Sequence, residues 1–355
     1  MKKNVFLIVA FAFLLVACGK KDMEETATLS GLFPSKFDYI TERGDTNQLY
    51  VLKNDNGMEA TVINIGARIV SLMVPDNTGT MQNVALGYDN VEPYLQLRDY
   101  YGAIVGRYAN RIADGTFVLD RLTHRVRQNE GKNMLHGGTN GFNTRYFTIE
   151  QLDEQNLVCT YFSKDGEEGF PGNLHLMVTY TLRDDNTLEV NYKATTDKAT
   201  VLNISNHSYF NLSGADAGSV ADHQLYIDAS KYTPTREDLI PTGEISEVQG
   251  TPLDYTSLRA VDPEYPYDLN YVLNHPEDID NVAVKLVSTK TGIQMEIYTT
   301  EPGMQLYSER KTRPSLALEP QHFPDSPNHP NFPSTILRPD SVFNSQTLYK
   351  FGIME

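Results

Sequence analysis

The chain has 355 residues, with 46 Asp or Glu against 30 Lys or Arg, and its formal net charge is −16. This acid excess argues against a nucleic-acid partner, because binding phosphates requires clustered Lys and Arg, and two cysteines are too few for a disulfide scaffold. The sequence has 21 Tyr and no Trp, and 40% of it is apolar. This composition predicts a globular protein with one large domain or two ordinary ones.

The N-terminus has the pattern of a secretion signal. Two lysines precede an unbroken apolar run, residues 5–17, which is too short to span a membrane and typical of a signal peptide. The run ends in a segment that resembles a bacterial lipobox, Leu15-Val16-Ala17-Cys18. We predict cleavage of residues 1–17 and lipid on Cys18, which would attach the protein to a periplasmic or surface face of the bacterial cell envelope. The alternative is an ordinary signal peptide with a chance Cys.

The mature chain is predicted to be a tethered single domain. Residues 18–30 are polar and lack periodicity, so we expect a flexible tether, followed by one domain over residues 31–355. Loss of the signal removes two lysines and takes the formal charge to −18. Cys159 lies in an alternating stretch and is expected to be a buried, unpaired thiol.

From about Phe33 onward, apolar residues alternate with a period of two, which predicts β-strands. Hairpins are expected to turn at residues 54–57, 184–186 and 290–292, where polar turn residues separate alternating runs. No stretch after the signal has a sustained helical period, and residues 31–355 contain no linker. These features predict an all-β fold, a large antiparallel β-sandwich.

Two polar clusters in the first half of the chain are candidates for a binding site. Residues 106–112 carry Asn110 and Arg111, which offer fixed donors to ligand oxygens. His136 precedes two glycines, where the backbone allows a ligand to approach closely. Taken alone, a solvated basic turn and an ordinary loop histidine are the favoured explanations of these two clusters.

Two further clusters lie in the second half. Residues 203–212, which include His207 and Tyr209, are too polar for a core segment unless every group finds a partner. Glu319 ends an apolar strand, where partial desolvation would raise its pKa and make it a better base. Taken alone, a strand-end Glu in solvent is the favoured explanation. The residues that follow, His322, Asp325 and His329, match no metal-ligand spacing, and no metal is predicted.

Together these segments resemble the aldose 1-epimerase (galactose mutarotase) family. Ten segments match in the family's order and span nearly all of residues 33–355: 57–58 with 66–67, 106–113, 135–138 with 141–142, 166–172, 206–212, 232–234, 240–243, 268–271, 302–307, and 318–321 through 324–325. The resemblance implies the family's large β-sandwich, no organic cofactor, and a monosaccharide substrate of the glucose or galactose type. Monomer and dimer both remain open.

The resemblance also implies residue roles. His207 would be the general acid that protonates the ring oxygen, and Glu319 the general base that takes the proton of the anomeric hydroxyl. Six residues would hold the sugar's hydroxyls: Asn110, Arg111, His136, Tyr209, Asp268 and Gln305. The ordinary pKa values, about 4.3 for Glu and about 6.5 for His, leave a fraction of sites in the required states near neutral pH. We expect burial or Asp268 to increase that fraction.

Three departures from the family pattern bear on the site. Arg121 and Leu122 stand where a Gly often occurs, and we expect only a hairpin turn to change. The loop 308–314 is short and charged, and three basic residues there leave room for a sugar phosphate: Arg310, Lys311 and Arg313. The family's Trp after Gly-Phe is missing, and we expect Tyr146 or Phe147 in its place.

Rival functions stay open at this point. They are a non-catalytic sugar-binding protein on the same fold, and an epimerase of another sugar or sugar phosphate. A glycoside hydrolase would need two carboxylates flanking the bond, for which Glu319 and Asp268 are the available pair.

Overall fold

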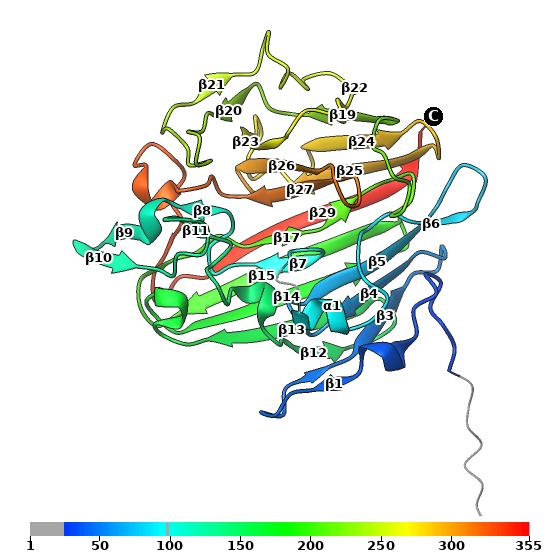
Figure 1. Cartoon of the computed structure of the whole chain (residues 1–355), viewed down its shortest axis with the longest axis horizontal. Coiled ribbons are helices and arrows are strands. Elements are labelled where there is room, and N and C mark those ends of the chain that lie inside the picture. The colour runs from blue at the N-terminus through cyan, green and yellow to red at the C-terminus, as the bar shows by residue number, and fades with distance from the viewer. Residues whose placement is uncertain (1–24, 97–98, 355) are drawn as a thin grey trace, which may run out of the picture.

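The computed structural model describes residues 25–96 and 99–354, and it consists almost entirely of antiparallel strands (Figure 1). The predicted signal peptide and Cys18 lie outside the described residues. The largest sheet has nine strands, in the order β12 (Thr148–Gln151), β13 (Asn156–Ser163), β14 (Leu174–Leu182), β15 (Thr187–Thr196), β29 (Phe343–Ile353), β25 (Ile293–Thr299), β24 (Val284–Ser288), β19 (His223–Ile227) and β22 (Arg259–Ala260). Along β14 buried residues alternate with more exposed ones, so one face of this sheet forms the core and the other faces outward.

Two smaller sheets complete the sandwich. One contains β18 (Tyr209–Phe210), β27 (Ser315–Gln321), β26 (Gly303–Glu309), β23 (Asp268–Val272), β20 (Lys231–Thr233) and β21 (Ser246–Glu247). The other contains β3 (Leu49–Lys53), β4 (Glu59–Ile63), β5 (Arg68–Pro75) and β6 (Met81–Asn83). One apolar core joins all three sheets, with Leu72, Val178 and Leu306 as members from each. The predicted all-β antiparallel architecture is confirmed.

Short elements connect the sheets. Five two-stranded pairs are present: β1 (Tyr39–Ile40) with β2 (Thr46–Asn47), β7 (Ala103–Val105) with β17 (Ser205–His207), β8 (Arg111–Ile112) with β11 (Met134–Leu135), β9 (Thr116–Leu119) with β10 (Leu122–Arg125), and β16 (Thr200–Val201) with β28 (Ile336–Leu337). The described helices are α1 (Glu92–Gln96) and the 3-10 turns η1 (Pro34–Phe37), η2 (Ala113–Gly115), η3 (Phe142–Thr144), η4 (Glu167–Gly169) and η5 (Ser326–Asn328). Within the described ranges, no helix has the length and apolar character needed to cross a membrane.

The predicted hairpins are present. The turns at 54–57, 184–186 and 290–292 join β3 to β4, β14 to β15 and β24 to β25. Asp120 and Arg121 form the two-residue turn between β9 and β10, and both adopt positive φ, 50° and 65°. Arg121, one of the two residues where the family often has a Gly, therefore lies in a hairpin turn, and the expectation that only this turn changes stays a prediction.

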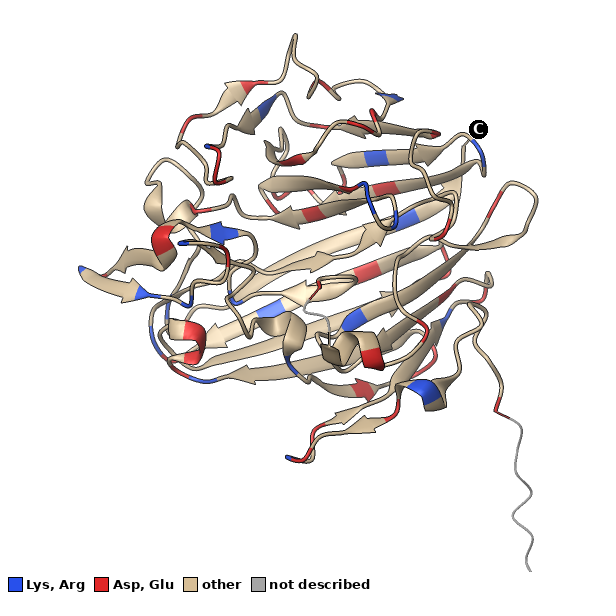
Figure 2. Ribbon diagram, in the orientation of Figure 1, with Lys and Arg blue, Asp and Glu red and all other residues tan. Residues whose placement is uncertain are grey.

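The start of the described chain lies against the sheets. The backbone N–H of Leu29 donates to Oε1 of Glu59 at 2.7 Å, and the hydroxyls of Ser30 and Ser71 are 2.9 Å apart. The part of the predicted tether that the structure describes, residues 25–30, therefore contacts the domain, while the division into signal, tether and domain stays a prediction. Cys159 is fully buried in the core and free, as expected. Figure 2 shows Lys and Arg scattered singly among Asp and Glu over the described residues.

Candidate active site

Twelve residues from distant parts of the chain line a cavity of about 200 Å³. Eight of them are the predicted site residues: Asn110, Arg111, His136, His207, Tyr209, Asp268, Gln305 and Glu319. The other four are Tyr100, Glu130, Leu135 and Tyr307. The fold thus brings every predicted sugar-contacting and catalytic residue to one place, while the roles of these residues stay predictions.

Strand register places one wall of this cavity. In the six-stranded sheet, Gln305 of β26 lies directly opposite Glu319 of β27. On the other side of β26, Tyr307 lies opposite Asp268 at the start of β23. Because directly opposed residues on adjacent strands project to the same face of a sheet, this register fixes two cross-strand pairs that line the cavity.

The second wall comes from the ends of β8 and β11. Asn110 and His136 both have positive φ, 62° and 48°, and the backbone N–H of His136 donates to the carbonyl of Asn110 at 2.9 Å. In return, the backbone N–H of Asn110 donates to Nδ1 of His136 at 3.1 Å. Nδ1 is therefore unprotonated, and the neutral ring carries its proton on Nε2. The result is a fixed donor on His136.

Arg111 is the centre of a paired network. Its guanidinium donates to both carboxylate oxygens of Glu130, at 2.7 and 3.0 Å, and to Oδ2 of Asp268 at 3.3 Å. Nε2 of Gln305 donates to the other oxygen of Asp268 at 2.6 Å. Bidentate contacts of this kind fix an Arg in position. Arg111, the one Lys or Arg that lines the cavity, is therefore paired with two carboxylates.

His207 and Glu319 form the second feature of the cavity. Nε2 of His207 lies 3.5 Å from Oε1 of Glu319, and the two residues are 3% and 1% exposed. The rings of Tyr209 and Tyr100 stack near the imidazole, with centroids 4.8 and 5.5 Å away. Three buried polar atoms here have no protein partner: Nδ1 of His207, Oε2 of Glu319 and Oε1 of Gln305. Unpaired buried atoms are costly, which points to a polar ligand that completes them.

Burial shifts both groups of this pair toward their neutral forms. It lowers the pKa of His207 to about 3, and it raises the pKa of Glu319 well above the usual range, with a further rise from Asp268 that Arg111 opposes. Burial also lowers the pKa of His136 well below its ordinary value, with His207 and Arg111 adding to the effect. The expectation that burial would favour an ionised Glu319 beside a protonated His207 is therefore wrong. Burial disfavours both charges, so a proton held by the pair lies on Glu319 rather than on His207.

The same cluster can be tested as a metal site. One ligand atom each from His136, His207 and Glu319 lie within 4.8 Å of one another. A metal on Nε2 of His136 would require a lone pair there, but the Asn110 contact keeps Nδ1 as the acceptor and the proton on Nε2. These residues suit hydroxyl groups better than a cation. Outside the cavity, His322 pairs with Glu301 and His329 with Asp325.

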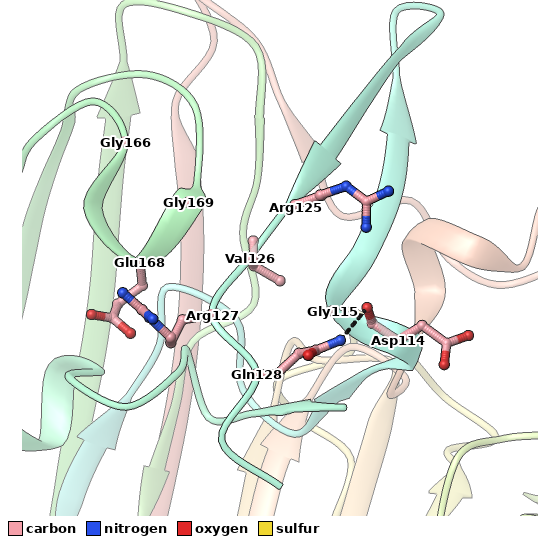
Figure 3. Close-up of a pocket in the computed structure, with 9 residues that line it drawn as sticks. All are labelled: Asp114, Gly115, Arg125, Val126, Arg127, Gln128, Gly166, Glu168 and Gly169. Carbon is pink, nitrogen blue, oxygen red and sulfur yellow. Dashed lines mark hydrogen bonds between the residues drawn. The ribbon is translucent and has the colours of Figure 1, made fainter. Parts of the chain in front are cut away.

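The motif at 166–172 supports the site from outside. The guanidinium of Arg107 donates to the carbonyls of Pro171 and Gly172 at 2.8 and 2.9 Å. Oε1 of Glu168 accepts from the side chain of Asn140 at 3.0 Å, and a Cβ on Gly138 would lie 2.6 Å from its Oε2. The turn thus packs against the loop that carries His136. A separate surface pocket of about 460 Å³ lies beside this turn. Figure 3 shows the turn on one side of that pocket and Asp114 and Gly115 on the other.

The aromatic wall differs from expectation. Tyr100, Tyr209 and Tyr307 line the cavity, whereas Tyr146 and Phe147 do not. Phe147 is 1% exposed and packs in the main core, and Tyr146 packs against a second apolar cluster. The replacement of the missing Trp therefore does not supply the sugar wall.

The basic loop 308–314 is also turned away from the cavity. Arg310 donates to the carbonyl of Glu264 at 2.8 Å, and Arg313 donates to the carbonyl of Gly87 at 2.7 Å and to Asp216 at 3.1 Å. Neither they nor Lys311 line the cavity. The case for a sugar phosphate loses its main support.

Four lining residues were missed by sequence reasoning. Leu135 and Tyr307 lie at the edges of segments that match the family, 135–138 and 302–307, so the sequence could have identified them as candidates. Tyr100 and Glu130 carried no such signal, because only the fold brings Glu130 to Arg111, 19 positions away.

Comparison with known proteins agrees with this site. The sequence profile described as aldose 1-epimerase matches residues 48–350. The chain is 36% identical to the galactose mutarotase of Homo sapiens over 337 residues, which cover 89% of this chain and 97% of the relative. It is also 36% identical to the aldose 1-epimerase of Escherichia coli K12, covering 87% and 96%.

Solved structures give the same result. An aldose epimerase homologue from C. elegans superposes with a TM-score of 0.83 at 28% identity, covering 87% of this chain and 100% of that one. The galactose 1-epimerase of Lactobacillus acidophilus superposes with a TM-score of 0.80 at 26% identity, covering 90% and 98%. The resemblance seen in the sequence is confirmed, and the chain belongs to the aldose 1-epimerase family of isomerases.

Proposed function

We propose that this protein interconverts the α and β anomers of free hexoses of the glucose or galactose type, with His207 and Glu319 as the proton-transfer pair. The observation that carries the proposal is the pair itself. Both groups are buried, lie 3.5 Å apart, and have an unpaired polar atom each in a cavity lined by hydroxyl-binding side chains. A non-catalytic sugar-binding protein would need no such pair.

The protons balance within the pair. Ring opening begins with protonated His207 and ionised Glu319. Glu319 takes the proton from the anomeric hydroxyl, a C1=O bond forms, the bond from C1 to the ring oxygen breaks, and His207 gives its proton to the ring oxygen. The pair is then left as neutral His207 and protonated Glu319. Reclosure on the other face of C1 runs the same transfers backwards and restores the start without a cofactor.

Burial favours the state that ring opening creates. The neutral pair after opening is the proton distribution that both pKa shifts favour. The charged pair needed for opening holds the same number of protons, so the protein converts one state to the other by moving a proton across the pair, with no exchange with solvent. Removing two opposite buried charges during the step contributes favourably to opening.

The remaining residues would hold the sugar while its C1 end turns. Nη1 of Arg111 has only a long contact, 3.5 Å to Asn110, and so retains donors for a hydroxyl. The Nε2 proton of His136 is a further fixed donor. Anchoring the distal hydroxyls leaves rotation about C1–C2 as the main freedom of the open chain, which keeps the carbonyl near the reacting pair.

Polarimetry of freshly dissolved α-glucose and α-galactose tests this function. The wild-type protein should accelerate the approach to anomeric equilibrium, and Glu319→Gln and His207→Asn should each lose the acceleration. Glu150→Gln and His124→Asn, which lie outside the cavity, are matched controls that should retain it. A wild-type protein that binds these sugars without accelerating the change would instead be a binding protein.

We also propose that lipid on Cys18 holds the protein on a membrane of the cell envelope. The lipobox-like segment supports this, and Cys159, the other thiol, is buried in the core. Cys18→Ser should release the protein from the membrane fraction and abolish labelling by a radioactive fatty acid. Unchanged pelleting of Cys18→Ser would contradict the proposal.

A further inference from the structure

We propose that the outer face of the nine-stranded sheet binds a neutral polysaccharide chain in an open groove, separate from the catalytic cavity. Two hollows on this face, of about 390 and 700 Å³, share Met177 and Lys193 among their lining residues. Because they share these residues, the two hollows adjoin, and together they form the groove of this proposal, which extends from β12 to β29.

Strand register arranges the groove's side chains in rows. One row crosses five neighbouring strands, each residue directly opposite the next: Thr148, Thr160, Met177, Lys193 and Asn344. With strands about 4.8 Å apart, four steps span about 19 Å. A second row, of Thr179, Asn191 and Gln346, lies beside the first, and a third contains Phe162, His175 and Thr195. The groove is therefore long enough for several sugar units.

The side chains suit the two kinds of surface on a sugar. Phe162 and Met177 are 43% and 41% exposed, and the Phe162 ring lies 4.6 Å from that of His175. Exposed apolar and aromatic groups of this kind pack on the C–H faces of sugar rings. Around them lie uncharged hydroxyl and amide groups, which are able to donate to and accept from sugar hydroxyls. The amides of Asn191 and Gln346 each also donate to Oε1 of Glu189 at 2.7 Å, which leaves one N–H of each for a ligand.

The groove carries few formal charges, with one Lys and two Glu among its lining residues. Lys193 and Glu277 line it, and at its far end Nδ1 of His322 lies 2.6 Å from Oε2 of Glu301. With one lysine and two glutamates, one of them paired with His322, the groove has no basic cluster for an anionic ligand, and the net charge of −16 also repels acidic polymers; we therefore infer an uncharged ligand. The interleaved polar rows also make the face unlike the apolar core of a stable dimer interface.

This groove serves no step of the proposed anomerisation. No residue of either hollow lines the catalytic cavity, which at about 200 Å³ has room for one hexose. A polysaccharide held on the outer face would keep the protein near a polymer whose hydrolysis releases free hexoses. The class of reaction that supplies the substrate is therefore glycoside hydrolysis.

Native electrophoresis through gels containing a soluble polymer tests the groove on the full chain. We expect laminarin, hydroxyethylcellulose or galactomannan to retard the wild type. Phe162→Ala should weaken the retardation about fivefold, and Asn344→Ala, an exposed change that leaves the core intact, should weaken it less. Phe33→Ala is the matched control, because Phe33 is 38% exposed and lies outside the groove. Mutarotation should be unchanged in all three variants.

Three results would overturn the proposal. The first is that none of the polymers retards the wild type, or that polygalacturonate alone does. The second is that the gel retards Phe162→Ala and Phe33→Ala equally. The third is a dimer of the wild type in sedimentation that Phe162→Ala dissociates, since the face would then be an interface between two copies. The gel assay measures binding without turnover. Its result can therefore be interpreted even if the proposed epimerase activity is not found.

Discussion

Two halves of the catalytic cavity are built on opposite principles. Around Arg111 every charge is paired, with two carboxylates on one guanidinium and Gln305 donating to Asp268. Around His207 and Glu319 polar atoms are buried without partners, and burial disfavours the charge of each group. In the proposed function this difference separates positioning from chemistry: the half with paired charges would hold the sugar, and the half with unpaired buried atoms would exchange protons with it.

The largest effect on activity is expected from Glu319→Gln, which removes the carboxylate of the His207–Glu319 pair. Loss of one proton-transfer partner should lower kcat/KM by roughly 10²–10⁴-fold, measured by polarimetry. Because the pKa of Glu319 is raised on folding, the carboxyl group must take up a proton on folding at pH values above the unfolded pKa of about 4.3, and this lowers the stability of the folded state. The variant should therefore be more stable than the wild type at pH 7, by about 0.5–2 kcal/mol in urea unfolding.

The pH dependence of stability provides the control for that prediction. Wild-type stability should fall relative to Glu319→Gln as the pH rises from about 4.3 toward the raised pKa of Glu319, and the two should converge in acid. Glu150→Gln should follow the wild type throughout. A Gln variant less stable than the wild type at pH 7 would show that the carboxylate is satisfied and would remove the contrast between the two halves.

Arg111→Lys should disrupt the half with paired charges. A lysine cannot reproduce the bidentate contact with Glu130 while also reaching Asp268, and a partly unpaired carboxylate remains near the sugar. We expect KM to rise by about 10–100-fold with a smaller change in kcat. The opposite division, with kcat lowered and KM unchanged, would assign Arg111 to the chemical step.

Glu130→Gln should have a smaller effect in the same direction. Asp268 still holds Arg111, so we expect KM to rise by about 3–10-fold with kcat nearly retained. The carboxylate of Glu130 is part-exposed, its side chain 35% accessible, so added salt should narrow the difference from the wild type. A loss of kcat comparable to that of Glu319→Gln would contradict this, because Glu130 would then take part in the chemical step as well as in positioning Arg111.

Local patterns predicted the strands, but not the walls of the site. Alternation in 174–182 and 188–194 identifies a hairpin because side chains alternate across any half-buried strand. Glu130 and Tyr100 could not be identified, because their importance depends on packing beside Arg111 and His207 from distant segments. The aromatic wall was misplaced for the same reason, since Phe147 turns into the core.

The protonation states show a similar limit. Matched segments identified His207 and Glu319 as a pair, yet ordinary pKa values predict the wrong resting state. Both groups are almost fully buried in the folded chain, and the cost of burying a charge decides where the proton lies. That cost is a property of the tertiary structure.

The central claim is that a proton held by the pair lies on Glu319 and leaves the imidazole of His207 neutral. Nitrogen-15 NMR of histidine-labelled protein at pH 7 tests it most directly, with His207→Asn used to assign the resonance. The account predicts a neutral imidazole for His207 that does not titrate between pH 5 and 8. An imidazolium at pH 7 in the sugar-free protein would contradict it.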